Sequence, residues 1–130
     1  MGWKIYKEIR QEGITSIDIA HLTDFQWDEL HIIGPYQFAS MEELCRAIRV
    51  DYDNCRNKLS FNRWSDDSVN GLVFKDKGRI VHSEVHWRVN GDFRSVPEGP
   101  LKRNEGKFVV RDSGERSTRG EPWLYLHHQK

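Results

Sequence analysis

Residues 70–89 constrain the fold more than any other part of the chain, because they predict a β-hairpin. The first strand is the apolar run 72–74, and the second strand covers residues 80–89. The residues that join them end in Gly78, which can adopt the positive φ angle that a tight turn requires. Hairpin strands run antiparallel, so the sheet of this protein should be antiparallel at least in this part.

Further strands are predicted where β-branched and aromatic residues lie between turn-forming residues. They are 14–22, 29–36, 107–112 and 122–128. The last should lie at a sheet edge because it begins with Pro122, which has no amide proton to donate to a neighbouring strand. Loops are expected in the polar or the glycine- and proline-rich segments 52–68, 91–106 and 113–121.

Residues 40–51 predict the clearest helix. Ser40 followed by Glu43 forms a capping box, in which a hydroxyl and a carboxylate each satisfy a free amide of the first turn. An apolar stripe at helical spacing follows and should pack against the core. It comprises Met41, Leu44, Cys45 and Ile48. Residues 3–13 fit either a short helix or a strand.

Together these elements predict a single α+β domain over residues 1–130. Its architecture should be one antiparallel β-sheet of about five to six strands, with one or two helices packed on it. The length of 130 residues and the apolar content of 37% are sufficient for one hydrophobic core.

The balance of charges limits the kinds of binding partner to be expected. Twenty acidic and twenty basic residues argue against a nucleic-acid-binding protein, which usually has a basic surface. The halves differ, since residues 1–70 hold 12 acids and 8 bases, a net charge of −4, and residues 71–130 hold the reverse. The halves can neutralise each other within the fold, or an acidic surface on the first half can attract a basic protein partner.

The two cysteines, Cys45 and Cys55, show no metal-binding spacing. Because Cys45 lies in the apolar stripe of the predicted helix, a buried free thiol is the expected state, and a disulfide between the two is the alternative. No segment is long enough to span a membrane, and the first residues lack the apolar core of a signal peptide. We therefore expect a cytoplasmic location, or the bacterial envelope if a signal segment has been removed.

His82, Glu84 and His86 would share one face of the second hairpin strand, and two imidazoles with a carboxylate resemble a zinc or iron site. However, residues four apart on a strand are separated by about 13 Å, so one metal ion could not bind both histidines. The opposite face should be the buried one, and it carries Val81, Ser83, Val85, Trp87 and Val89. We therefore predict an exposed histidine face, no metal site, no cofactor and no catalytic residue.

Residues 23–36 read TDFQWDELHIIGPY, in which Phe25 and Trp27 lie between acids. The two rings should anchor the segment in the core. The stretch resembles a family of small, mostly uncharacterised bacterial proteins in which Thr-Asp-Phe-x-Trp-Asp leads into an apolar strand that ends in Gly-Pro-Tyr. The resemblance extends to the helix from Ser40 and to residues 71–81. It implies a lipoprotein-like envelope protein and supplies no activity.

The lack of catalytic motifs, the single domain and the acidic first half predict a non-enzymatic protein-binding protein. By class it is similar to bacterial immunity proteins, so the partner would be a basic toxin or hydrolase, bound by a monomer or weak dimer. The partner-binding residues would be Asp18, Asp24, Asp28, Glu29, Glu42 and Glu43, with Tyr36 and Trp64 as aromatic anchors. The alternatives are an envelope protein without its anchor and a small hydrolase or nuclease that uses His31, His82 or His86.

Overall fold

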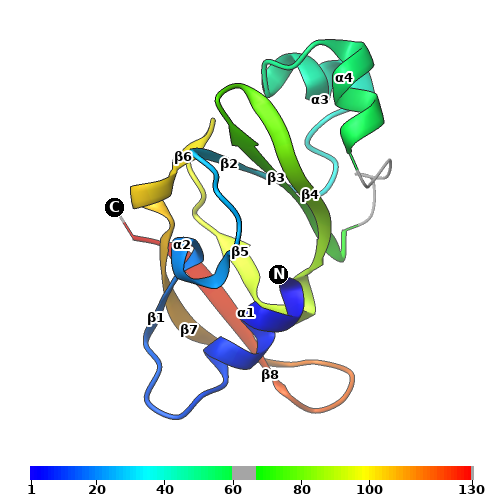
Figure 1. Ribbon diagram of the computed structural model, residues 1–130. Coiled ribbons are helices and arrows are strands. Elements are labelled where there is room, and N and C mark those ends of the chain that lie inside the picture. The colour runs from blue at the N-terminus through cyan, green and yellow to red at the C-terminus, as the bar shows by residue number, and fades with distance from the viewer. Residues whose placement is uncertain (60–66, 130) are drawn as a thin grey trace.

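The computed structural model describes residues 1–59 and 67–129, whose strands form two four-stranded β-sheets (Figure 1). Sheet A has the strand order β1 (Ser16–Asp18), β7 (Lys107–Arg116), β8 (Pro122–His128) and β5 (Asp92–Arg94). Sheet B has the order β4 (Arg79–Trp87), β3 (Val69–Asp76), β2 (Glu29–Ile33) and β6 (Leu101–Lys102). Neighbouring strands are antiparallel except β5 and β8, which run parallel.

Short helices connect these strands. They are α1 (Gly2–Ile9), α2 (Ile19–Leu22), α3 (Met41–Ala47) and α4 (Tyr52–Lys58), with the 3-10 turns η1 (Arg88–Asn90) and η2 (Arg103–Glu105). The predicted N-cap of α3 is confirmed, because Ser40 Oγ accepts from the Glu43 amide at 3.2 Å. The second half of the capping box differs, since Glu43 Oε2 accepts from the amide of Ala39, one residue before the cap, at 3.1 Å. In the described part of the chain, no helix is long and apolar enough to cross a membrane.

The α+β class is confirmed, but the prediction of a single sheet is wrong. The error lies in residues 91–106, a predicted loop that contains β5 of sheet A and β6 of sheet B. The chain therefore crosses between the sheets both before and after β5. Gly91 makes the first crossing possible: its φ is +145°, and a Cβ atom there would lie 3.0 Å from side-chain atoms of Ile5 and Leu126.

Two predicted strands also differ from the structure. The predicted strand 14–22 ends at Asp18, because the Asp18 carboxylate accepts from the Ala20 amide at 3.0 Å and starts α2. Strand β8 is not an edge strand, since it lies between β7 and β5. Pro122 is tolerated there because it is the first residue of the strand, where a missing amide proton removes little of the ladder.

The main hydrophobic core lies between the two sheets and is closed by α1. Its buried residues include Ile5, Ile9, Ile17, Leu30, Leu72, Phe74, Phe93, Leu101, Phe108 and Leu126. Trp27 is also buried here, where its ring centroid lies 5.2 Å from that of Phe74 and its indole N–H donates to Thr23 Oγ1 at 2.9 Å. The predicted role of Trp27 as an anchor of residues 23–36 is therefore confirmed.

A second core lies on the other face of sheet B, under α3 and α4. Its buried residues are Ile33, Leu44, Cys45, Ile48, Cys55, Val73 and Ile80. Lys75 of β3 is buried at its edge and donates through Nζ to the carbonyl oxygen of Ile48 at 2.6 Å. Ile48 ends α3, where the free carbonyl groups favour a cation, so this bond fixes the helix on the sheet.

The predicted burial of β4 is only partly correct, because sheet B is covered on both faces. Ser83 is buried and Val85 packs against the second core, as predicted, whereas Trp87 and Val89 are 51% and 39% exposed. His86, which was expected to be exposed, is fully buried, and its Nε2–H donates to the Gly91 carbonyl at 2.7 Å. Val81 is 47% exposed, because a register shift opposite the Phe74–Lys75 step turns it away from the ladder. Alternation of polar and apolar residues identifies the buried face only where the other face meets solvent.

Cys45 of α3 and Cys55 of α4 form a disulfide with a Cα–Cα distance of 5.8 Å, so the predicted free thiol is wrong. The error follows from α4, which occupies part of a predicted loop. Asp51 starts this helix by accepting from the Asn54 amide at 3.2 Å. Because residues 52–58 are helical, Cys55 points into the second core and meets Cys45 there.

Reduction of this disulfide should lower the free energy of unfolding by about 2–3 kcal/mol, because the bond closes a short loop in the unfolded chain. Urea unfolding with and without dithiothreitol measures the difference. The double variant Cys45→Ala/Cys55→Ala should show no response to the reductant. Equal stability of the oxidised and reduced native protein would contradict the expectation.

Candidate functional site

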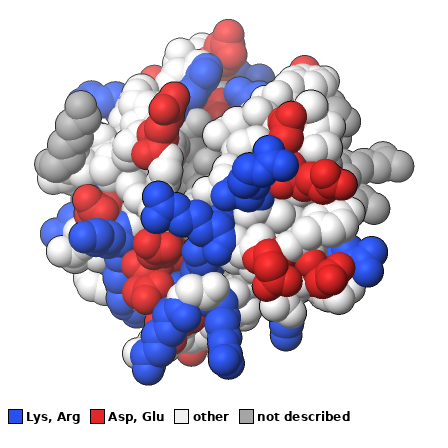
Figure 2. All heavy atoms as spheres, turned by 90° about the horizontal axis from the view of Figure 1, so that it is seen from above, with Lys and Arg blue, Asp and Glu red and all other residues white. Residues whose placement is uncertain are grey.

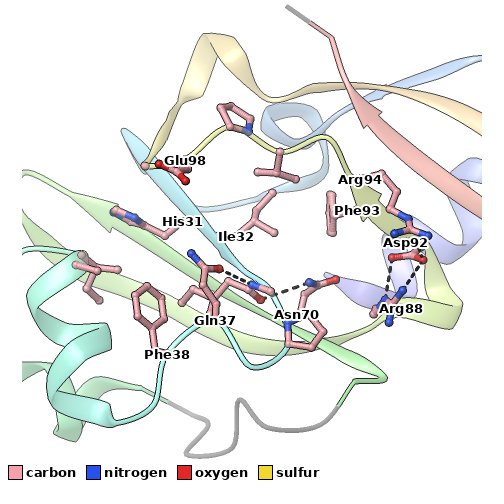
Figure 3. A pocket seen from close by; sticks show the side chains of 18 of the residues that line it. His31, Ile32, Gln37, Phe38, Asn70, Arg88, Asp92, Phe93, Arg94 and Glu98 are labelled. Carbon is pink, nitrogen blue, oxygen red and sulfur yellow. Dashed lines mark hydrogen bonds and ion pairs between the residues drawn. The ribbon is translucent and has the colours of Figure 1, made fainter.

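A groove of about 560 Å³ opens between the two sheets, beside α3 (Figure 3). One wall consists of the end of β2 and the turn that follows it, from His31 to Phe38. The opposite wall is β5 with the segment after it, residues 92–99. Ala47, Ile48, Asp67, Asn70 and Arg88 complete the lining. The volume lies within the range of pockets that bind small molecules or peptide side chains.

The edge of β2 is unpaired where it lines the groove. β3 pairs with all residues of β2, whereas β6 pairs only with Glu29 and Leu30. Among the described strands, residues 31–33 therefore have a neighbour on one side only. A free strand edge presents backbone N–H and C=O groups that can pair with another extended chain.

The turn after β2 covers the next donor along this edge. The amide of Gly34 donates to Oε1 of Gln37 at 2.8 Å, and the Gln37 amide donates back to the Gly34 carbonyl at 3.3 Å. Tyr36, with a φ of +59°, makes this turn tight. The exposed Gln37 side chain thus occupies the position that the carbonyl group of a neighbouring strand would take.

Asp92 organises the opposite end of the groove. Its fully buried carboxylate accepts from Nε and Nη2 of Arg88 at 2.9 and 3.0 Å, and from the indole N–H of Trp123 at 3.0 Å. Nε of Arg94 lies 3.6 Å away, and the Arg94 guanidinium carbon lies 4.5 Å from the ring centroid of Tyr125. The hydrogen bond to Asp92 raises the pKa of Arg88. The Asp92 carboxylate therefore holds the guanidinium groups of Arg88 and Arg94 in place at this end of the groove.

Two buried polar atoms of the lining have no hydrogen-bond partner in the described structure. They are Oδ1 of Asn70 and Nε2 of His31. The side-chain nitrogen of Asn70 donates weakly to the Ile33 carbonyl at 3.4 Å, which leaves the oxygen available. Buried polar atoms without partners are uncommon in folded proteins, and those that line a groove indicate a place for a ligand or water molecule.

The buried environment keeps the His31 ring neutral. Burial, together with the nearby Lys75 ammonium group, lowers the pKa of His31 to about 4. At neutral pH the ring therefore offers one donor and one acceptor nitrogen, and adds no positive charge to the groove.

The predicted partner-binding acids occupy three parts of the fold. Asp18 caps α2, whereas Asp24, Asp28 and Glu29 precede or begin β2, and Glu42 and Glu43 form the first turn of α3. Of the two aromatic anchors, Tyr36 is 65% exposed at the rim of the groove, between the lining residues Pro35 and Gln37. Trp64 lies outside the described residues.

Several of these acids already have contacts within the chain. A carboxylate oxygen of Asp28 accepts from the Lys77 amide at 3.0 Å, and Glu29 lies 3.6 Å from Nζ of Lys75. On the face seen in Figure 2, acidic and basic side chains are interspersed rather than separated into fields of one sign. The Glu29–Lys75 pair joins an acid of the first half to a base of the second, which favours the interpretation that the two halves neutralise each other within the fold.

Of the histidines named for a hydrolase or nuclease, His31 and His82 are not brought together. His31 shares a face of β2 with Ile33, the face that α3 covers. The partly exposed His82 ring lies on the other face of sheet B, 5.0 Å from the ring of Phe25 and 5.8 Å from that of Phe74. His82 instead contacts Glu84 at 2.8 Å. Within residues 1–59 and 67–129, no cluster of three or more acidic, histidine or cysteine side chains could hold a metal ion.

Sequence reasoning missed most of the groove, since its lining comes from segments that are far apart in the chain. A signal was present at His31, a polar residue inside the apolar run 30–33, and at Asn70, which begins an apolar strand. Both are polar residues at strand positions that burial would make costly. Two partners of Asp92, Arg88 and Arg94, lie within four residues of it in the sequence. The third, Trp123, meets it only after β5 pairs with β8, so no local pattern showed that Asp92 would be buried.

Comparisons with protein-family models, with curated proteins and with solved structures found no match to this chain.

Replacement of Asp92 by asparagine should lower the free energy of unfolding by about 3 kcal/mol, because Arg88 and Arg94 would lose the anion that they share. Urea unfolding at neutral pH measures this loss. Asp24→Asn is the matched control, since Asp24 is exposed and lies 3.9 Å from Lys4, and it should change stability by less than about 0.5 kcal/mol. Equal effects of the two substitutions would show that Asp92 has no organising role.

His31 should make the protein less stable as the pH falls from about 6.5 to about 4. In this window the unfolded chain binds a proton on His31 and the folded protein does not, so the free energy of unfolding falls by up to about 3 kcal/mol. His31→Gln should flatten this part of the profile, measured by urea unfolding at a series of pH values. The slope will not vanish, since burial also lowers the pKa of His86. Identical slopes in both proteins would refute the role of His31.

Proposed function

We propose that this protein is a non-enzymatic protein-binding protein of the immunity or inhibitor kind, which blocks a bacterial toxin or hydrolase. The observation that carries the proposal is the groove beside the free edge of β2. Its lining combines apolar side chains with Asn70 and His31, whose buried polar atoms lack partners in the described structure. Such a combination supplies both the burial and the directional bonds that specific recognition needs.

The exposed acids and Tyr36 would have a supporting role in this proposal. Asp24, Glu42 and Glu43 are exposed, and Tyr36 lies at the groove rim, so they would be available to contact the surface of a partner. Acids of this kind would raise the association rate with a basic partner, and salt would reduce their effect. The groove would supply the contacts that slow dissociation.

A disulfide supports a second candidate, an envelope protein. The Cys45–Cys55 bond joins α3 to α4 in the second core. Disulfides persist in oxidising compartments and are rare in the cytoplasm, so the bond favours the envelope over the cytoplasmic location expected from the sequence. An inhibitor that acts in the envelope would satisfy both candidates.

Site-specific photo-crosslinking tests the proposal. The photoreactive residue p-benzoylphenylalanine would replace Gln37 in the groove or, as a control, Glu12, an exposed residue that does not line it. Irradiation of the source cells should yield one discrete protein adduct from the Gln37 position and none from Glu12. The crosslinked partner, purified, should lose its enzymatic or toxic activity when one equivalent of the native protein is added.

Two outcomes would refute the proposal. A partner that binds at Gln37 but keeps its full activity in the presence of excess protein would exclude an inhibitor. Equal adducts from Gln37 and Glu12 would exclude the groove as the binding site.

A further inference from the structure

We infer that the groove binds an extended, basic segment of the partner protein, which adds as a strand to the free edge of β2. The inference rests on the proposed function, because it names the part of the partner that the groove would hold. Three properties of the lining lead to it: the unpaired strand edge, the apolar side chains on both sides of that edge, and the excess of carboxylates.

The backbone of β2 supplies the first argument. Residues 31–33 have a ladder neighbour only in β3, and the next amide, that of Gly34, is held by the side chain of Gln37. An added strand would pair with this edge through its own N–H and C=O groups. Asn70 Oδ1 and His31 Nε2 lack partners in the described structure, and an extended backbone offers donors and acceptors in alternation.

The side chains beside the edge supply the second argument. Ile32 packs against the main core and lines the groove together with Phe93 and Val96, as Figure 3 shows for Ile32 and Phe93. Ile33 and Phe38 belong to the second core and line it on the other side of β2. Successive side chains of an added strand would point to these two sides in turn, so both would meet apolar surface.

Charge selects a basic segment. The lining carries the carboxylates of Asp67, Asp92 and Glu98 and the guanidinium groups of Arg88 and Arg94, three negative charges against two positive, a net charge of −1. His31 adds no charge at neutral pH. Asp92 is occupied by both arginines, whereas Glu98 is exposed and has no ion pair within the described residues. A lysine or arginine of the bound segment would therefore pair with Glu98.

Short synthetic peptides test this mode of binding directly. A random peptide library displayed on phage would be selected on the native protein, and dissociation constants of the selected peptides would be measured by fluorescence anisotropy. Each backbone amide of one peptide would then be N-methylated in turn, which removes a donor and leaves the side chain unchanged. Binding should weaken by about tenfold or more at every second residue, because alternate amides of a strand face the same neighbour.

A charge reversal tests the preference for a basic segment. Selected peptides should be enriched in lysine and arginine, and Glu98→Lys should weaken their binding by about tenfold at low salt. Glu12→Lys makes the same charge change at an exposed residue outside the groove and should leave the dissociation constant unaltered.

The inference is wrong if no peptide is enriched, if N-methylation has no two-residue period, or if the selected peptides show no basic bias. These results are separable from failure of the proposed function. A partner that crosslinks at Gln37 and is inhibited, while peptides fail the N-methyl test, would leave the inhibitor role standing and remove strand addition. Conversely, if N-methylation weakened binding at every second residue but no crosslinked partner were inhibited, strand addition would stand and the inhibitor role would be removed.

Discussion

Sheet B has apolar residues on both faces, and the positions of most other elements follow from this. Strand β3 contributes Leu72 and Phe74 to the main core and Val73 to the second, so neither face can meet solvent without loss of burial. Sheet A and α1 cover one face, and α3 and α4 cover the other. The same burial obliges Lys75 to find a partner, which it does at the end of α3.

Local signals in the sequence predicted local structure correctly. The hairpin around Gly78, the N-cap at Ser40 and the anchoring of Trp27 depend on contacts between neighbouring segments or on one bulky side chain. Long-range relations were not predictable in this way. The crossing at Gly91 depends on a φ angle and on two side chains that arrive from distant segments, and a glycine in a loop-like sequence looks the same whether or not the chain changes sheets.

The candidate site was likewise predictable in its local features and not in its long-range arrangement. Its polar members His31 and Asn70 were visible as polar residues in apolar strands, but nothing in the sequence showed that they would line one groove. The pairing of β2 with β6 determines where the groove lies. Because this pairing ends at Leu30, the edge of β2 beyond that residue is free. None of the six predicted acids lines this groove, because composition reports how many charges a chain has and not where the strands end.

Gln37 gives the groove a property that its shape alone would not provide. Because its side chain already accepts the Gly34 amide proton, it acts as an intramolecular competitor for any incoming chain. An incoming polypeptide must break the Gly34–Gln37 hydrogen bond before it can form its own bond to the Gly34 amide. One matched backbone group therefore contributes almost no net free energy of binding. Only chains that form several bonds along the edge at once would be retained, which protects a free strand edge from indiscriminate association with other extended polypeptides.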